Sequence, residues 1–318
     1  MPKIKIQRGA EVYHNGEVEI EVQRDYQDLA DQSDQIVRDI VKAYPKTKRL
    51  YESIMSDPRI MAQWDLANYI AVVKLGFNDH GPIHAQVVAA AAMQMMQLLL
   101  QRGVGVDVIQ SGAGDLDDAH AVVLAGILLH DIGNQIHRVN HEAFSLTLAQ
   151  PIVERHFAPI YTDPEQLQTM IGFTLSTIAC HDCNPPPLTM EGAVVAVADA
   201  TDMTKGRGRV AFDLGKIDIH SVSALAIEAV SIRSGSATPI EIIVSLSNSA
   251  GIFQVEEILA RKLVVTPLKD YVTIRAVAAS DFPEFDQRII HSVVFDKGRF
   301  RVDNDSKDSP QTDDNVTG

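Results

Sequence analysis

The chain has 318 residues, of which 46% are hydrophobic and only 6% aromatic. This length is typical of two domains, or of one domain with an appendage, and the apolar share is enough for a sizeable core of mainly aliphatic side chains. The formal net charge of -14 argues against a nucleic acid polymer or an anionic membrane as the partner of this chain.

The N-terminal half begins with a β pattern and continues with helical ones. Residues 1–24 alternate apolar and charged side chains around His14-Asn15-Gly16, which predicts a short β-hairpin with an Asn-Gly turn. From 25 to 75 apolar residues recur at helical spacing. A helix is expected over 82–100, because Pro82 falls early in it, where proline is tolerated. This apolar helix is shorter than a membrane span and carries glutamines, so we expect it in the core.

The middle of the chain predicts more helices. A loop rich in Gly and Asp covers 101–118, and the next helix ends at His130-Asp131. Gly133 interrupts the pattern, and helices follow over 140–157, 164–178 and 192–203. We therefore predict one helical domain over 25–210.

The pattern changes in the last third of the chain. Helices are predicted over 221–232 and 252–262, and strands over 240–246, 271–277 and 291–295. These elements indicate a small α+β domain over 211–302. Residues 303–318 are polar and acidic, which predicts a disordered tail. The fold class is thus mostly α, with a small C-terminal α+β domain and a short N-terminal β-hairpin.

Histidine and aspartate residues fall on or beside the apolar helices. Burying an ionised carboxylate without a partner is costly, and a divalent metal ion is a suitable partner for the adjacent pair His130-Asp131. Helical bundles build metal sites from facing helices, and this mixture of ligands suits Mn, Fe, Co, Ni or Zn, with one or two ions per chain. Two ions bridged by Asp131 would use all the candidate ligands, which are His84, His130, Asp131, His141, His181 and Asp199.

The order of these residues resembles the HD-domain superfamily of metal-dependent phosphohydrolases. The tetrapeptide His130-Asp-Ile-Gly133 occurs in many members, and 197–204 is similar to the helix that carries the last aspartate of that family. His141 and His181 fall where binuclear members have additional ligands. The resemblance covers roughly 75–210 and implies an HD-type helical bundle. No Gly-Tyr-Pro motif is present, which places the chain apart from the members that cleave cyclic dinucleotides.

The resemblance implies a hydrolase that cleaves a phosphomonoester or phosphodiester of a small molecule or nucleotide through a metal-bound hydroxide. Asp131 would bridge the ions at the catalytic centre, and Asp202 or His137 would orient a ligand or carry a proton. Lys205, Arg207 and Arg209 could grip the substrate phosphate. A basic loop without a ligand explains these three residues equally well.

Several alternatives are open. His137 lies about one helical turn before His141 and competes with it as a ligand. Cys180 and Cys183 could bind zinc, but a single Cys-x-x-Cys is weak evidence, and two reduced thiols are the simpler interpretation. For the whole protein, one alternative is an HD-type di-iron oxygenase, since a few members use the same ligand set for oxygen activation. The other is a sensor of a nucleotide or metal without catalytic activity.

The expected partners and location follow from composition. We expect a small phosphorylated substrate, no nucleic acid polymer and no membrane, with the C-terminal domain as a possible surface for homo-oligomers. A metal ion can reverse the local field, so the acidic net charge does not exclude a phosphate substrate. The charged N-terminus does not resemble a signal peptide, and two cysteines imply no disulfide framework. The expected location is therefore the cytoplasm.

Overall fold

The computed structural model describes residues 24–207, 219–278, 292–296 and 299–302. Residues 1–23 of the predicted hairpin, Arg209 and the predicted tail over 303–318 lie outside the described residues. The predicted boundary between the two domains, at 210, also falls in a range that is not described. Within the described ranges the chain is mostly helical with one small sheet, as the sequence predicts.

Helices build the part of the chain up to residue 199, and several of them have proline in the first turn, where its missing N–H costs nothing. A π-helical turn, η1 (Tyr69–Lys74), follows α3. The helices are α1 (Arg24–Val41), α2 (Pro45–Met55), α3 (Pro58–Asn68), α4 (Pro82–Gln101), α5 (Asp107–Gln110), α6 (Leu116–Leu129), α7 (His141–Phe157), α8 (Pro164–Ala179) and α9 (Met190–Asp199).

Two apolar helices, α4 and α6, form the centre of the core. Helix α6 is buried on all sides, which explains its continuous apolar sequence, and it packs against α2, α4, α8 and α9. Helix α4 is long and apolar enough to cross a membrane by length and composition, yet 67% of that segment is buried inside the protein. This burial is what a core helix shows, so the apolar sequence is weak evidence for a membrane.

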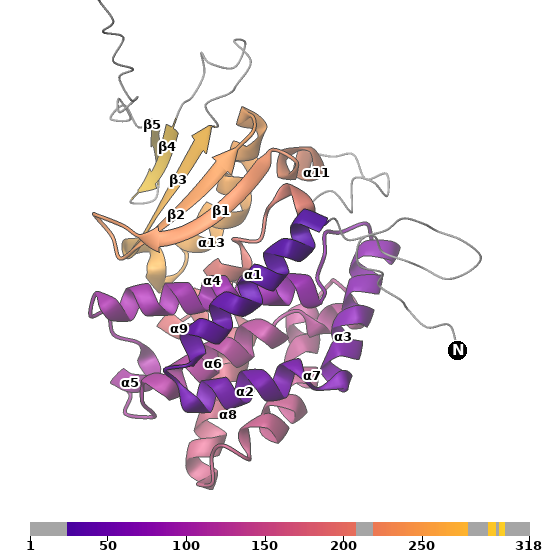
Figure 1. Ribbon diagram of the computed structural model, residues 1–318, viewed down its shortest axis with the longest axis vertical. Helices are drawn as coiled ribbons and strands as arrows, with labels where there is room; N and C mark the ends of the chain where they lie inside the picture. The colour runs from indigo at the N-terminus through magenta and orange to yellow at the C-terminus, as the bar shows by residue number, and fades with distance from the viewer. Residues whose placement is uncertain (1–23, 208–218, 279–291, 297–298, 303–318) are drawn as a thin grey trace, which may run out of the picture.

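The C-terminal part places a five-stranded sheet beside the helices (Figure 1). The strand order follows the sequence: β1 (Ile227–Ser234), β2 (Ile240–Leu246), β3 (Val272–Ala278), β4 (Ser292–Asp296) and β5 (Arg299–Val302). Among the described strands, β2 and β3 are the one parallel pair. Their connection is helical and contains η3 (Ser249–Gly251), α12 (Ile252–Gln254), η4 (Val255–Ala260), α13 (Arg261–Val264) and η5 (Pro267–Asp270). Helix α13 contacts α9. A short helix, α11 (Ile219–Ala224), precedes the sheet.

Most of the predicted elements are confirmed, but the helix predicted over 221–232 is wrong beyond residue 224. Strand β1 begins at Ile227, and its residues Val230 and Ile232 pair with Val244 and Ile242 of β2. These β-branched residues alternate with polar ones, which is a strand pattern that the helical interpretation overlooked. The helix predicted over 192–203 ends at Asp199, so Asp202 lies beyond its end.

Candidate metal centre

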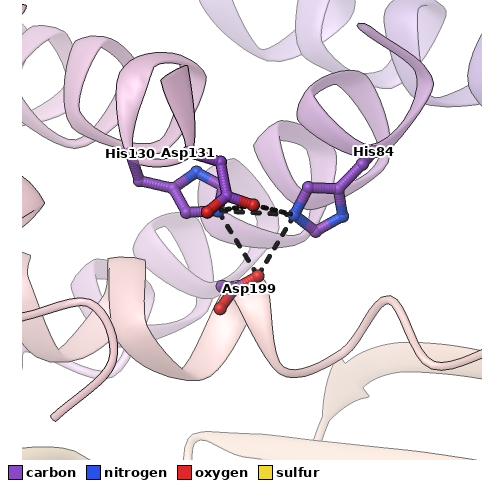
Figure 2. Close-up of side chains that lie close together, drawn as sticks. All are labelled: His84, His130, Asp131 and Asp199. Atoms are coloured by element: carbon purple, nitrogen blue, oxygen red, sulfur yellow. Dashed lines mark hydrogen bonds and ion pairs between the residues drawn. The ribbon is translucent and has the colours of Figure 1, made fainter. Parts of the chain in front are cut away.

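Four side chains from three helices converge on one point. His84 lies in the first turn of α4, His130 and Asp131 follow α6, and Asp199 ends α9. The Nε2 atoms of His84 and His130 are 3.3 Å apart. The Oδ1 atom of Asp199 lies 3.2 Å from the first of them and 3.4 Å from the second. Figure 2 shows these side chains pointing at one another, and we call them the first donor set.

A second donor set shares Asp131 with the first. His141 and His181 bring their Nε2 atoms within 3.0 Å of each other. The Oδ1 atom of Asp131 lies 3.2 Å from His141 Nε2 and 3.7 Å from His181 Nε2. The other carboxylate oxygen, Oδ2, faces His84 at 3.5 Å and His130 at 3.3 Å. The two oxygens of Asp131 therefore face different sets, which is the arrangement of a bridging ligand.

The remaining ring nitrogen of each histidine contacts an oxygen that can only accept a hydrogen bond. His84 Nδ1 lies 2.7 Å from Asp202 Oδ2, and His130 Nδ1 lies 2.7 Å from the carbonyl oxygen of Ile127. His141 and His181 make the same kind of contact with backbone carbonyl oxygens. These acceptors hold a proton on Nδ1 and leave Nε2 as the ligand atom. The donor sets thus fit a divalent metal ion, which would take the place of a proton between His84 and His130 and of the hydrogen bond from Arg138 Nη1 to His141 Nε2.

The charges of the first donor set favour a cation. Burial opposes a charge on His130, but the neighbouring Asp131 and Asp199 raise its pKa to about 10. Burial also opposes charges on Asp131 and Asp199, yet His130 and Lys262 respectively hold the pKa values of these carboxyls well below the ordinary range. A proton on His130 therefore balances the carboxylates, and a metal ion would replace it. Burial and His130 lower the pKa of His181 to about 3, so this imidazole stays neutral.

Gly133 explains how the chain places His141 beside Asp131. The 3₁₀ turn η2 (Ile132–Gln135) packs against the start of α7, and the Gly133 N–H donates to Ser145 Oγ at 2.8 Å. A methyl group at position 133 would overlap the carbonyl oxygen of His141 and lie 2.5 Å from the Ser145 amide nitrogen. Asn140, with φ of 62°, turns the chain so that α7 begins at His141.

Of the two residues predicted to orient a ligand or carry a proton, Asp202 contacts a ligand and His137 does not. Asp202 is buried and accepts from Tyr26 at 2.8 Å besides contacting His84, so it can orient this ligand. The structure does not bring His137 to the site: this side chain is exposed, and its Nδ1 accepts from the Val139 N–H at 2.9 Å. His137 points away because it belongs to the turn before α7 and not to the helix itself.

Of the residues predicted to bind the substrate phosphate, the structure brings Arg207 to the site but not Lys205. Lys205 pairs with Glu228 and does not line the cavity beside the donor sets. Arg207 does line it, and its guanidinium donates to the carbonyl oxygens of Asp79 at 2.9 Å and Asp202 at 2.6 Å. Arg209 lies outside the described residues, so its role stays a prediction.

A cavity of roughly 320 Å³ opens beside the donor sets, between the helices and the C-terminal part. Sequence reasoning missed several residues that line it. Lys262 comes from α13 and donates to Asp199 Oδ2 at 2.7 Å. Arg138 donates to His141 Nε2 at 2.9 Å, and its position three residues before His141 was the one signal available. His80 is buried and faces the cavity, with Nε2 4.0 Å from Asp131 Oδ2.

The cysteines give no support to the zinc alternative. Cys180 and Cys183 are free thiols, and neither belongs to a donor set among the described residues. Burial raises the pKa of Cys180 to about 12 and that of Cys183 to about 11, so both stay protonated. Protonated thiols are poor metal ligands, which agrees with the interpretation as two reduced cysteines.

The chain is similar to a protein of an archaeon. Over 240 residues the chain is 39% identical to a protein of Methanocaldococcus jannaschii described as "Uncharacterized protein MJ1020". The match covers 76% of this chain and 92% of the relative. No family model matches the chain. No solved structure matches it either.

Proposed function

The chain belongs to the same family as the uncharacterized protein MJ1020 of Methanocaldococcus jannaschii, and we propose that it is a metal-dependent phosphohydrolase. The proposed substrate is a phosphomonoester or phosphodiester of a small molecule or nucleotide. The ordered residues His84, His130-Asp131 and Asp199 resemble the ligand set of the HD-domain superfamily. The proposed cofactor is a pair of divalent transition metal ions, one at each donor set.

The observation that carries this proposal is the arrangement around Asp131. Its two carboxylate oxygens face separate pairs of imidazoles, at 3.2 to 3.7 Å. Every one of those imidazoles presents Nε2 while Nδ1 is held by a carbonyl or carboxylate oxygen. This orientation directs four Nε2 atoms at the two oxygens of one carboxylate, which supports a bridged pair of metal ions.

Basic side chains in the cavity support an anionic substrate once metal ions are bound. Arg138, Arg207 and Lys262 line the space beside the donor sets together with four carboxylates, those of Asp131, Asp182, Asp199 and Asp202. The divalent ions would therefore supply the excess of positive charge. Arg207 is held by two carbonyl oxygens and is largely buried, so it can present its charge without reorganising. Phe77 and Ile258 give the same cavity an apolar wall for the organic part of the substrate.

The division of chemical roles follows from these positions. Bound divalent ions would lower the pKa of a water molecule and neutralise charge on phosphoryl oxygens. His80 is a candidate to contact the substrate or a water molecule, because it lines the cavity with Nε2 4.0 Å from Asp131 Oδ2 and its Nδ1 contacts the carbonyl oxygen of Asn78. The basic side chains orient the phosphoryl group, and Asp202 keeps His84 in position.

The test combines metal content with turnover. We expect roughly two equivalents of metal in protein purified without chelator or affinity metal, as a bridged site requires. Such protein should hydrolyse phosphate esters from a broad panel with added Mn, Co or Ni. The variant Asp131→Asn should lose both equivalents and more than about a hundredfold of the activity. Asp31→Asn, at an exposed position of α1, is the matched control and should change neither.

Other outcomes would replace the proposal. Bound iron with oxygen consumption and no hydrolysis would favour the di-iron oxygenase. Tight binding of a nucleotide without turnover would favour the sensor. Absence of metal even after reconstitution would overturn every proposal that places a metal ion at these residues.

A further inference from the structure

Lys262 enters the candidate metal centre from the C-terminal part of the chain. It lies on α13, only 14% of its side chain is exposed, and Nζ donates to Asp199 Oδ2 at 2.7 Å and to the carbonyl oxygen of His181 at 2.9 Å. Asp199 uses its other oxygen, Oδ1, toward His84 and His130. The ammonium group therefore lies directly behind a donor of the first set without occupying the position of a metal ion.

The third partner of Lys262 is Asp182, which lies outside the two donor sets that share Asp131 but forms a further potential metal-binding group with His141 and Glu142. Asp182 Oδ1 lies 3.0 Å from Lys262 Nζ, and Oδ2 lies 3.8 Å from Arg138 Nη2 and 4.0 Å from His141 Nε2. An anion thus lies in the cavity between two cations and beside the second donor set.

We propose that Lys262 is a substrate-binding residue and that the Asp182 carboxylate holds the place of a substrate phosphoryl group, which displaces it on binding. The inference rests on the proposed phosphohydrolase function and names the residues that recognise its phosphate. Lys262 would exchange one carboxylate for a phosphoryl oxygen while keeping its bonds to Asp199 and to the backbone.

Exposure and charge both favour Asp182 as the group that leaves. Its side chain is 28% exposed, twice the 14% of Asp199, so Asp182 can turn toward solvent when an anion enters. A phosphoryl group carries more charge and more acceptor oxygens than a carboxylate, so it would gain more from Lys262 and Arg138 together. The exchange also relieves the repulsion that an incoming anion would meet at an occupied carboxylate site.

The experiment measures inorganic phosphate binding by calorimetry to the full chain saturated with Mn²⁺. Lys262→Met should weaken phosphate binding by roughly tenfold or more, the size of one charge-assisted hydrogen bond, while retaining the Mn²⁺ content. Asp182→Asn should tighten phosphate binding several-fold, because the internal competitor loses its charge. Lys262→Arg should recover part of the affinity. The control is Arg261→Met, whose side chain is 78% exposed on the same helix, and it should bind phosphate as the unmodified chain does.

Lys262→Met and Asp182→Asn are expected to change phosphate affinity in opposite directions, and this difference distinguishes a role in phosphate binding from a role in folding. A merely structural Lys262 would lower the melting temperature and the Mn²⁺ content together, and Asp182→Asn would then weaken phosphate binding or leave it unchanged; either result overturns the inference. If the Lys262→Met variant does not fold, the phosphate affinity of the Asp182→Asn variant still tests the inference. If the protein hydrolyses no ester but both variants change phosphate affinity as expected, the proposed function is wrong and the site is an anion-binding site.

Discussion

Asp202 holds His84 by the ring nitrogen that faces away from the donor set. Its Oδ2 atom lies 2.7 Å from His84 Nδ1 and accepts from the Tyr26 hydroxyl at 2.8 Å. The second oxygen, Oδ1, is buried and has no hydrogen-bond partner among the described residues. A carboxylate that leaves one buried oxygen unpaired costs stability, so the contribution of Asp202 to the site lies in its contact with His84.

The substitution Asp202→Asn tests this role. The new amide can present an N–H to His84 Nδ1, which would move the imidazole proton to Nε2 and remove the lone pair that faces the donor set. We expect metal affinity of the first donor set to fall by about 10–100-fold, as is usual for residues that orient a metal ligand. Competition with a chelating dye measures this affinity, and Asp31→Asn again serves as the control. An unchanged affinity would show that Asp202 does not control the tautomer of His84.

The sequence predicts the metal ligands of the site but not Lys262. The six candidate ligands were found because each is a polar residue in an apolar setting, and the structure brings all six into the two donor sets. Lys262 gave no such signal, since Glu256, Glu257, Arg261 and Lys262 look alike as charged residues of one helix. Only Lys262 turns toward α9, and this depends on contacts between distant segments.

At the scale of elements, the start of α7 controls the second donor set. Gly133 allows η2 to touch the first turn of α7, where His141 is the first helical residue. A side chain at 133 forces the two backbones apart, and the carbonyl oxygen of His141 is the atom that it would meet. The glycine of the tetrapeptide His130-Asp-Ile-Gly133 is therefore explained by close packing next to a ligand.

Gly133→Ala should affect the two donor sets unequally. We expect one equivalent of metal to be lost or weakened while the first donor set keeps its own, because His84, His130 and Asp199 do not depend on α7. Metal titration followed by mass spectrometry distinguishes the two equivalents. Gly172→Ala is the matched control, because a methyl group there meets nothing within 4 Å. Equal loss of both equivalents would contradict this assignment of Gly133 to the second set.

The elements themselves were largely predictable where burial follows a simple period. The helices around α4 and α6 and the strand β2 (Ile240–Leu246) were predicted from apolar spacing. The strand β1 was mistaken for a helix because the helix α11 runs directly into it, and one apolar stretch contains both. The packing of α13 against α9 could not be predicted, since no local pattern records which helix lies beside a distant one.

For the whole molecule, an ion-pair cluster away from the donor sets joins α3 to α7. Asp57 caps the N-terminus of α3, and its side chain is only 4% exposed. Its Oδ2 atom lies 2.9 Å from Arg59 Nη2 and 3.0 Å from Arg155 Nη2. His156 Nε2 contacts the same oxygen at 3.2 Å. The Arg59 hydrogen bonds hold the pKa of Asp57 well below its ordinary value, despite burial. Folding therefore favours the charged form of this carboxyl.

The consequence is a pH-dependent contribution to stability. Because the pKa of Asp57 is lower in the folded state, its stabilisation is present above about pH 3.9, the ordinary value, and is lost as pH falls through the folded pKa. Asp57→Asn keeps a capping side chain but loses the charge. We expect it to lower the free energy of unfolding at pH 7 by about 1.5–3 kcal/mol, and by less at pH 3. Guanidinium unfolding of the metal-free chain at both pH values measures the difference. The control is Asp163→Asn, because Asp163 caps α8 without an ion pair among the described residues, and its effect on stability should not depend on pH in this way. An equal loss of stability for Asp57→Asn at both pH values would contradict the role assigned to the Asp57 charge.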